Sequence, residues 1–180
     1  MKRILFSLFA IMTMVNMNAQ LRQIVIDGKN YATAVADSAV CRNPDTNNVY
    51  GGEHNSELQN FMMKNLRYPA LAQENKVEGR VMVLYIVNEE GVVSSVTPVH
   101  FNGHKATETK SIAEVALEAE MQNRNMSEKQ QRKYLQGVRE LLAEAVRVTF
   151  AFPKSLQPAM KDGKPVKVEM GMPYTFRLKK

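Results

Sequence analysis

The side chains in this sequence with the clearest chemical potential are two histidines and a carboxylate. His100 and His104 are four residues apart and Glu108 follows them, a spacing that on one helix face could hold a metal ion. However, Asn102 and Gly103 lie between the histidines and interrupt a helix. The sequence therefore favours a solvated loop over a metal site, and we expect no bound metal.

Two other groups of residues could be imagined in catalysis. Cys41 is the only cysteine, and with His54 and an acid it could form a nucleophilic site, but no motif surrounds it. Glu89 and Glu90 are adjacent in a predicted turn, where their carboxylates should point apart into water. The sequence has no nucleophile elbow or phosphate loop. We therefore predict a protein that is not an enzyme, with no catalytic residues and no cofactor; an exported enzyme is the disfavoured alternative.

The elements that would position any site are organised around a predicted β-hairpin. Residues 81–87 are seven consecutive apolar residues, a length and composition typical of a buried strand. Residues 88–91 form a turn that ends in Gly91, and residues 92–99 supply a second, half-solvated strand. Other elements must cover this hairpin.

Helix starts are predicted by capping boxes, in which a serine is followed three residues later by Glu or Gln. The three pairs are Ser56 with Gln59, Ser111 with Glu114, and Ser127 with Gln130. Pro69 ends the first helix and suits the start of a short second one. The last helix should stop near Phe150 or Phe152 because Pro153 follows, and its later half should pack on the sheet.

The clearest alternation in the chain lies at its C-terminal end and predicts a strand with one buried face. The residues expected to face the core are Val166, Val168, Met170, Met172, Tyr174, Phe176 and Leu178. The residues expected to face water are Lys167, Glu169, Thr175 and Arg177. Pro173 lacks an N–H donor, so it favours an edge strand over a central one.

The N-terminal end has the outline of a secretory signal peptide over residues 1–19. Lys2 and Arg3 precede an apolar run over residues 4–15, which is shorter than the roughly 20 residues that a membrane-spanning helix needs. We expect cleavage and a periplasmic protein without a stable membrane span; an uncleaved inner-membrane anchor is the alternative. Residues 20–49 would then form an N-terminal extension with a possible β-hairpin around Asp27-Gly28.

Composition narrows the possible partners. The chain has 180 residues, 44% of them apolar, which is enough for one domain with a hydrophobic core. Loss of Lys2 and Arg3 would leave 22 basic against 18 acidic residues, and these are interspersed, so we expect no nucleic-acid binding. Cys41 has no second cysteine to pair with; a buried thiol is favoured, and a disulfide between two chains is the alternative.

Several short segments, taken in order, carry a resemblance to a known family. They are Gly51-Gly52-Glu53, residues 61–69 (FMMKNLRYP), residues 77–81 (VEGRV), residues 88–92 (NEEGV), Glu144-Ala145-Val146, Phe152-Pro153-Lys154, Pro158 and residues 163–166 (GKPV). This succession resembles the TonB C-terminal domain, in the form common among exported Bacteroidetes proteins, over residues 50–180. The resemblance implies an α+β fold in which a small antiparallel β-sheet carries helices on one face.

The resemblance also implies a binding module that adds an edge strand to an extended segment of a TonB-dependent outer-membrane transporter. In strand addition, unpaired backbone groups give affinity and alternate side chains give selectivity. The candidate partner-binding residues are Val166, Lys167, Val168, Glu169, Met170 and Gly171. Because Pro173 removes one donor, we expect the productive part to end at Gly171. The alternative is a structural domain that forms a homodimer through the same strand.

Three departures from the family pattern bear on the role. The sequence contains neither a membrane helix nor a long Pro-rich linker, so we expect a stand-alone periplasmic relative. It also has no Trp, and Leu156 stands nearest the place of the family's tryptophan. Residues 100–136 resemble a charged helical insertion, for which a solvated helical hairpin is the first interpretation. A second partner surface at Met121, Met126 and Tyr134 is the alternative.

Overall fold

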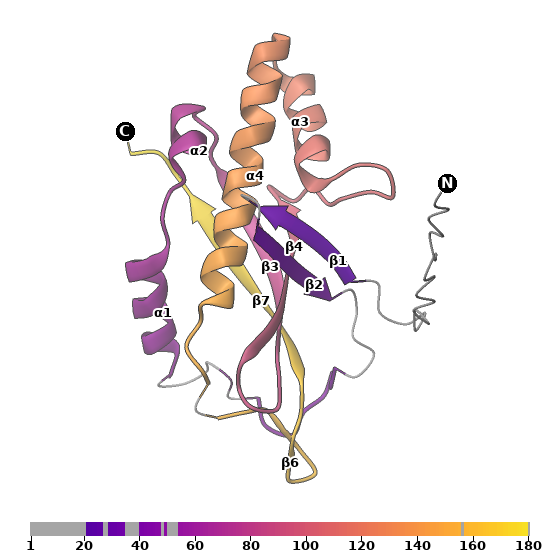
Figure 1. The fold of residues 1–180 in the computed structure, drawn as a ribbon, viewed down its shortest axis with the longest axis vertical. Helices are drawn as coiled ribbons and strands as arrows, with labels where there is room; N and C mark the ends of the chain where they lie inside the picture. The colour runs from indigo at the N-terminus through magenta and orange to yellow at the C-terminus, as the bar shows by residue number, and fades with distance from the viewer. Residues whose placement is uncertain are drawn as a thin grey trace, which may run out of the picture.

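A three-stranded antiparallel sheet with helices packed on it forms the centre of the structure, a computed structural model (Figure 1). The structure describes residues 21–26, 29–34, 40–47, 49, 54–155 and 157–179. The sheet has the order β4-β3-β7, with β3 at Gly79–Val87, β4 at Val93–Phe101 and β7 at Val168–Phe176. The helices are α1 at His54–Asn65, α2 at Ala70–Glu74, α3 at Ile112–Asn123 and α4 at Glu128–Phe150. The fold is α+β, as predicted.

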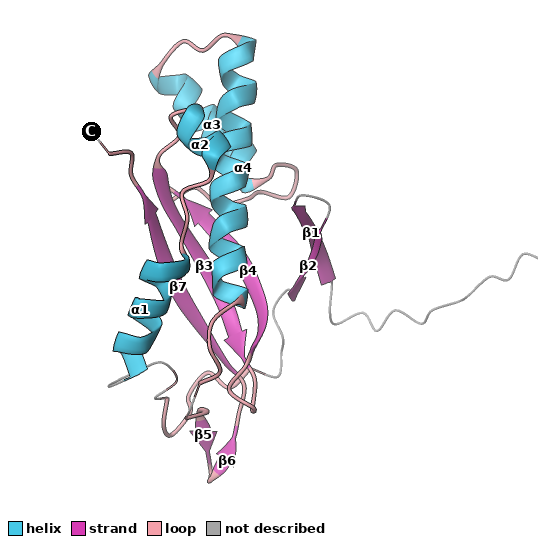
Figure 2. Cartoon of the chain, turned by 60° about the vertical axis from the view of Figure 1, so that its left-hand side comes forward, coloured by secondary structure: helices cyan, strands magenta, loops and turns pink. Residues whose placement is uncertain are grey.

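Two short hairpins accompany the main sheet. The strands β1 (Leu21–Ile26) and β2 (Lys29–Ala34) pair antiparallel, and β2 lies next to β4. The strands β5 (Met160–Lys161) and β6 (Lys164–Pro165) form the hairpin that protrudes at one end of the molecule (Figure 2). The predicted signal peptide, the Asp27-Gly28 turn and Gly51-Gly52-Glu53 lie outside the described residues.

The central hairpin is confirmed, with longer strands than predicted. The turn between β3 and β4 is closed by Asn88, whose side-chain oxygen accepts hydrogen bonds from the backbone N–H groups of Glu90 and Val92. Gly91 takes a φ of 78°, which suits a residue without a Cβ. At its other end β4 continues through His100 to Phe101, so His100 belongs to a strand and not to the expected loop.

The capping boxes of α3 and α4 are confirmed. The hydroxyls of Ser111 and Ser127 each accept a hydrogen bond from the third residue of their helix, whose side chain returns to the serine N–H. The third prediction, a helix start at the Ser56 and Gln59 pair, is wrong, because α1 already begins at His54 and Ser56 lies inside it. With Ser56 as the N-cap the first helical residue would be Glu57, whereas the helix begins three residues earlier, at His54.

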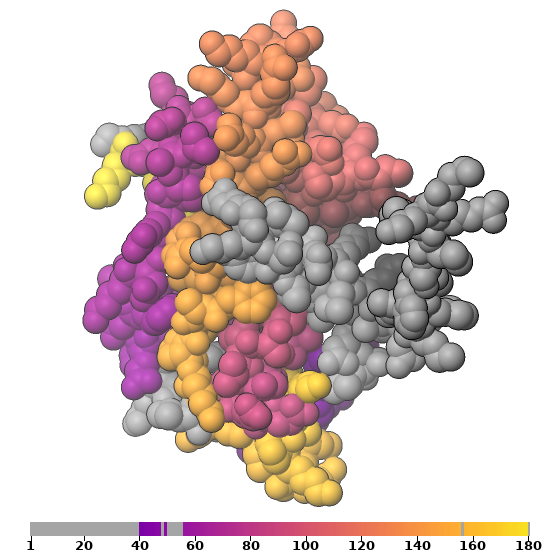
Figure 3. Space-filling view, viewed as in Figure 1, coloured from indigo at the N-terminus to yellow at the C-terminus, as the bar shows by residue number. Residues whose placement is uncertain are grey.

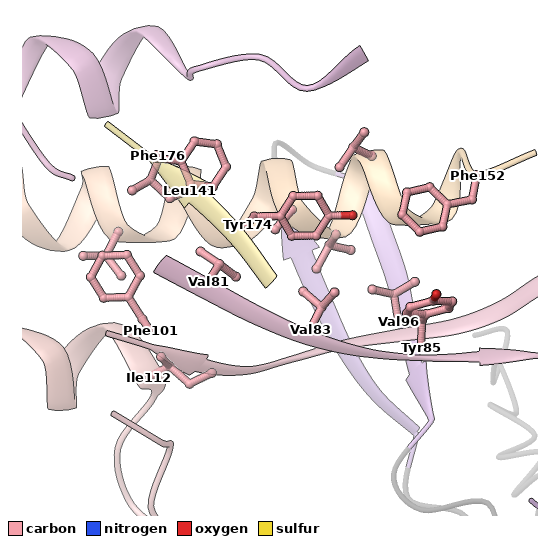
Figure 4. Packing of buried hydrophobic residues seen from close by; sticks show 14 of the residues in the cluster. Val81, Val83, Tyr85, Val96, Phe101, Ile112, Leu141, Phe152, Tyr174 and Phe176 are labelled. Carbon is pink, nitrogen blue, oxygen red and sulfur yellow. The ribbon is translucent and has the colours of Figure 1, made fainter. Parts of the chain in front are cut away.

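The core lies between the sheet and α4 (Figure 4). The helix α4 ends at Phe150, as predicted, and its later part buries an apolar stripe that includes Val138, Leu141 and Val146. Burial of side chains of this size stabilises the fold by roughly 1.5–3 kcal/mol each. Tyr85 and Phe152 meet edge to face at 5.6 Å between ring centroids, so the sheet also packs on the segment that follows α4.

The segment expected as a charged insertion, residues 100–136, comprises the end of β4, the helix α3 and the start of α4. It is not solvated on all sides, because α3 buries Ile112, Ala113, Ala116 and Leu117. In the space-filling view α3 lies on one side of α4, and α1 and α2 lie on the other (Figure 3). Among the described residues, no helix is both long and apolar enough to cross a membrane.

The close approach of α2 to α4 gives a first prediction. A Cβ built on Gly137 would lie 2.5 Å from Val77 Cγ2 and 3.5 Å from Ala72 Cα. We expect Gly137→Ala to lower the free energy of unfolding by about 1–2 kcal/mol, because overpacking outweighs the gain in helix propensity. Urea unfolding measures this. The exposed neighbour Gln136 is the control, since Gln136→Ala should change stability by less than about 0.5 kcal/mol. Equal stability of Gly137→Ala and the parent protein would contradict the close contact.

Candidate functional site: the open edge of β7

The strand β7 lies at the edge of the main sheet and pairs only with β3 among the described residues. Its side chains alternate as predicted: Val168, Tyr174 and Phe176 are buried, whereas Glu169 and Thr175 are exposed. The burial pattern follows the pleat of a strand with helices on one face and water on the other. Pro173 therefore stands on an edge strand, where a missing donor is tolerated.

The backbone groups that face away from β3 can be assigned from one hydrogen bond. The carbonyl of Lys167 accepts a hydrogen bond from the N–H of Cys41, at 2.8 Å, and so points away from β3. In a strand, the backbone groups of alternate residues point to the same side. Glu169, Gly171, Pro173 and Thr175 therefore direct their backbone groups outward; we call these four residues the open edge. Pro173 fits this position because its nitrogen needs no partner in β3.

The segment before α1 covers the start of β7. Besides the Cys41 contact, the N–H of Asp45 donates to the carbonyl of Met160, and Asp45 forms an ion pair with Lys161 at 2.7 Å. The hydrogen bond from Lys161, then that from the Asp162 N–H, lowers the pKa of Asp45. We call residues 41–46 the strap. It ties the N-terminal part of the chain to the β5–β6 hairpin beside the open edge.

The six residues predicted to bind a partner lie in this region, but their backbone groups differ in direction and in hydrogen-bond partner. Val166 donates its N–H to the carbonyl of Ala159, and the carbonyl of Lys167 is taken by the strap. Val168 and Met170 direct their backbone groups toward β3 by the alternation. Glu169 and Gly171 belong to the open edge, which continues through Pro173 and Thr175. Sequence patterns missed the strap, because nothing local marks residues 41–46 as partners of residues 160–167.

The strand is held firmly from its buried side. The hydroxyl of Tyr174 is hydrogen-bonded to that of Thr149 at 2.7 Å, and Thr149 donates to the carbonyl of Ala145 in α4. The ring of Phe176 meets that of Tyr68 edge to face at 5.7 Å. On the other face, a Cβ at Gly171 would make only ordinary contacts with the side chains of Leu84 and Met82. The open edge is thus a fixed template and not a loose strand.

The second predicted surface is only partly on the outside. Met121 is 42% exposed, Met126 packs partly against the core, and Tyr134 is buried at 8% exposure. Tyr134 is buried because α3 packs beside α4. Burial, followed by the nearby Glu120 carboxylate, raises the pKa of Tyr134 to about 12, and Arg124 opposes the shift. Of the three, Tyr134 could not meet a partner without a rearrangement of these helices.

Among the described side chains, those considered for chemistry are not grouped into a site. His104 follows the Asn102-Gly103 turn, where both residues have positive φ, and it exchanges backbone hydrogen bonds with Phe101. Glu89 and Glu90 are exposed in the β3–β4 turn. Within the described part of the chain, no three His, Cys, Asp or Glu side chains are grouped in a way that could hold a metal ion. The side chain of His54 lies outside the described residues.

Comparisons with known proteins give two similar structures. No protein-family model matches the chain, and no curated protein matches it significantly. The structures are NMR solution structures of the Helicobacter pylori TonB C-terminal domain, residues 194–285 and residues 179–285. Each is 18% identical; the first covers 72% of this chain and 99% of its own with a TM-score of 0.32, and the second covers 76% and 90% with a TM-score of 0.31.

The two buried tyrosines give a prediction for alkaline pH. Burial raises the pKa of Tyr174 and brings that of Tyr134 to about 12, whereas an unfolded tyrosine has 10.0. Their stabilising effect is complete below pH 10 and is lost as the pH rises from there, by up to about 1.4 kcal/mol per pH unit for each phenol. Urea unfolding between about pH 8 and pH 11 should show this loss.

The matched variants are Tyr134→Phe and Tyr174→Phe, which cannot ionise. Each should lose less stability between pH 9 and pH 11 than the parent, and Tyr174→Phe should also cost about 1 kcal/mol at neutral pH, because a buried hydrogen bond is lost. Thr149 keeps its bond to Ala145 in that variant. Parallel pH curves for all three proteins would contradict the role of these phenols.

Proposed function

We propose that this protein is a non-enzymatic, periplasmic binding module that captures an extended segment of a partner protein by strand addition at the open edge. The observation that carries the proposal is the outward set of backbone groups on β7, whose open side is met by no strand among the described residues. Such a row offers main-chain hydrogen bonds to an incoming strand. The chemistry needs no catalytic group, metal or cofactor.

The partner named by the family resemblance is a TonB-dependent outer-membrane transporter, and we propose a protein of that kind as the natural guest. Rigidity supports the proposal, because a strand already fixed by Tyr174 and Phe176 loses little conformational freedom when a guest binds. The proposed binding residues are those of the open edge. Of the residues proposed from the sequence, this set keeps Glu169 and Gly171, and it adds Pro173 and Thr175.

Hydrogen exchange on the full chain tests strand capture, with short peptides of about ten alternating Thr and Val residues as the probe. The N–H groups of Glu169, Gly171 and Thr175 should gain protection when peptide is added. Those of Met170, Met172 and Tyr174 should be protected already, because they bond to β3. This alternation distinguishes strand addition from general burial of β7. Equal protection of both sets in the free protein would contradict an open edge.

A pair of substitutions at one residue isolates the backbone donor. Glu169→Pro removes the outward N–H, whereas Glu169→Gln keeps it and removes the same charge. We expect peptide affinity to fall by about fivefold in Glu169→Pro and to stay near the parent value in Glu169→Gln, since one hydrogen bond contributes about 1 kcal/mol. Unchanged binding by a folded Glu169→Pro variant would exclude this edge as the site.

Self-association through β7 is the competing proposal, because an open edge can also pair with a second copy. Light scattering distinguishes the two. A mass near 20.4 kDa, with the outward amides of β7 protected only by peptide, supports capture of a guest. A mass near twice that value, with those amides protected before peptide is added, would mean that the edge serves a homodimer.

A further inference from the structure

Three cations gather at the C-terminal end of the open edge. Arg177 and Lys179 follow β7 directly and are exposed. Arg80 on β3 is the register partner of Thr175 and is also exposed, so it stands beside the last residue of the edge. We call these three residues the basic end. The sequence alone does not reveal this grouping, because Arg80 is distant in the chain from the other two.

The charge at the basic end is only partly balanced. Glu78 lies nearby, and its carboxylate accepts a hydrogen bond from the N–H of Leu178. The ion pairs of the described residues occur elsewhere, on α3, on α4 and in the strap, and none includes a member of the basic end. The acidic side chain on the edge itself, Glu169, lies at the opposite end of β7. Lys167 lies two residues before Glu169 and balances its charge, so the net positive charge along β7 lies at the basic end.

The strap limits where a guest strand can lie. The N–H of Cys41 already occupies the carbonyl of Lys167, so a guest cannot continue along β7 past Glu169 toward residues 160–167. A strand that pairs with the remaining outward groups must extend from Glu169 toward Thr175. One end of the guest then lies beside the basic end.

We propose that the open edge selects an extended protein segment that carries acidic side chains at the end that lies beside Arg177, Lys179 and Arg80. This inference rests on the proposed function and names the chemistry of its guest. Opposite charges favour binding in one orientation, and like charges disfavour the reverse. A protein segment fits better than nucleic acid, because the outward backbone groups of the open edge can pair with another peptide backbone and three cations neutralise few phosphates.

Peptide affinity measured by fluorescence anisotropy on the full chain tests the inference. The probes are alternating Thr/Val peptides with two Glu residues at the N-terminal end, with two Glu at the C-terminal end, or with Gln in both places. One of the two Glu peptides should bind about 3- to 10-fold more tightly than the Gln peptide in dilute buffer. The preference should shrink in roughly 0.5 M salt, because exposed charges are then screened.

The double variant Arg177→Gln/Lys179→Gln should bind all three peptides with the affinity of the Gln peptide. The control variant, Lys129→Gln/Lys133→Gln, removes the same charge from exposed positions on α4 and should keep the preference. The Arg177→Glu variant should bind a peptide that ends in Lys more tightly than the Gln peptide. This result would show that the losses in the double variant come from charge and not from a weakened fold.

The outcomes separate this inference from the proposed function. Equal affinities for Glu and Gln peptides, together with protection of the outward amides, would overturn the acidic preference and leave strand capture intact. Absence of protection by any peptide would overturn strand capture itself. Binding of phosphatidylglycerol vesicles or of polyuridylate that is lost in the Arg177→Gln/Lys179→Gln variant would overturn the protein guest in favour of a membrane or nucleic acid.

Discussion

The hydrogen bond between the hydroxyls of Tyr174 and Thr149 fixes the register on which the rest of the edge depends. Both residues are at most 1% exposed, so an unpaired hydroxyl at either position would carry the full cost of desolvation. A shift of β7 by one residue would turn Tyr174 toward water and bring Pro173 to the core face. The bond therefore determines which backbone groups of β7 face outward.

A second polar contact holds the helices around this sheet. Glu144, 8% exposed on α4, receives two hydrogen bonds from Arg147 at 2.7 Å and one from the backbone N–H of Arg67. Arg147 also donates to the carbonyl of Asn65, the last residue of α1. The buried carboxylate is thus fully partnered, and the link from α1 to α2 is tied to α4.

Local patterns predicted the elements well, and long-range contacts account for what they missed. The alternation around Tyr174 and the boxes at Ser111 and Ser127 were predictable because each is complete within a few residues. The strap was not predictable, because Asp45 forms its ion pair with Lys161, which is distant in the sequence. Tyr134 looked like a surface residue in a polar helix, and only the packing of α3 buries it. Which backbone groups of β7 face outward could not be assigned from local patterns for the same reason, because the assignment rests on the contact between Lys167 and Cys41.

Pro173 has a consequence for the behaviour of the protein at high concentration. A sheet edge that can accept one strand can also start the indefinite stacking of many copies, as in amyloid, where an unbroken row of donors and acceptors repeats along the fibre. The proline interrupts that row at its middle, and the strap blocks one end. A single short guest can still bond on both sides of the gap, whereas a growing fibre would meet the same gap at every layer.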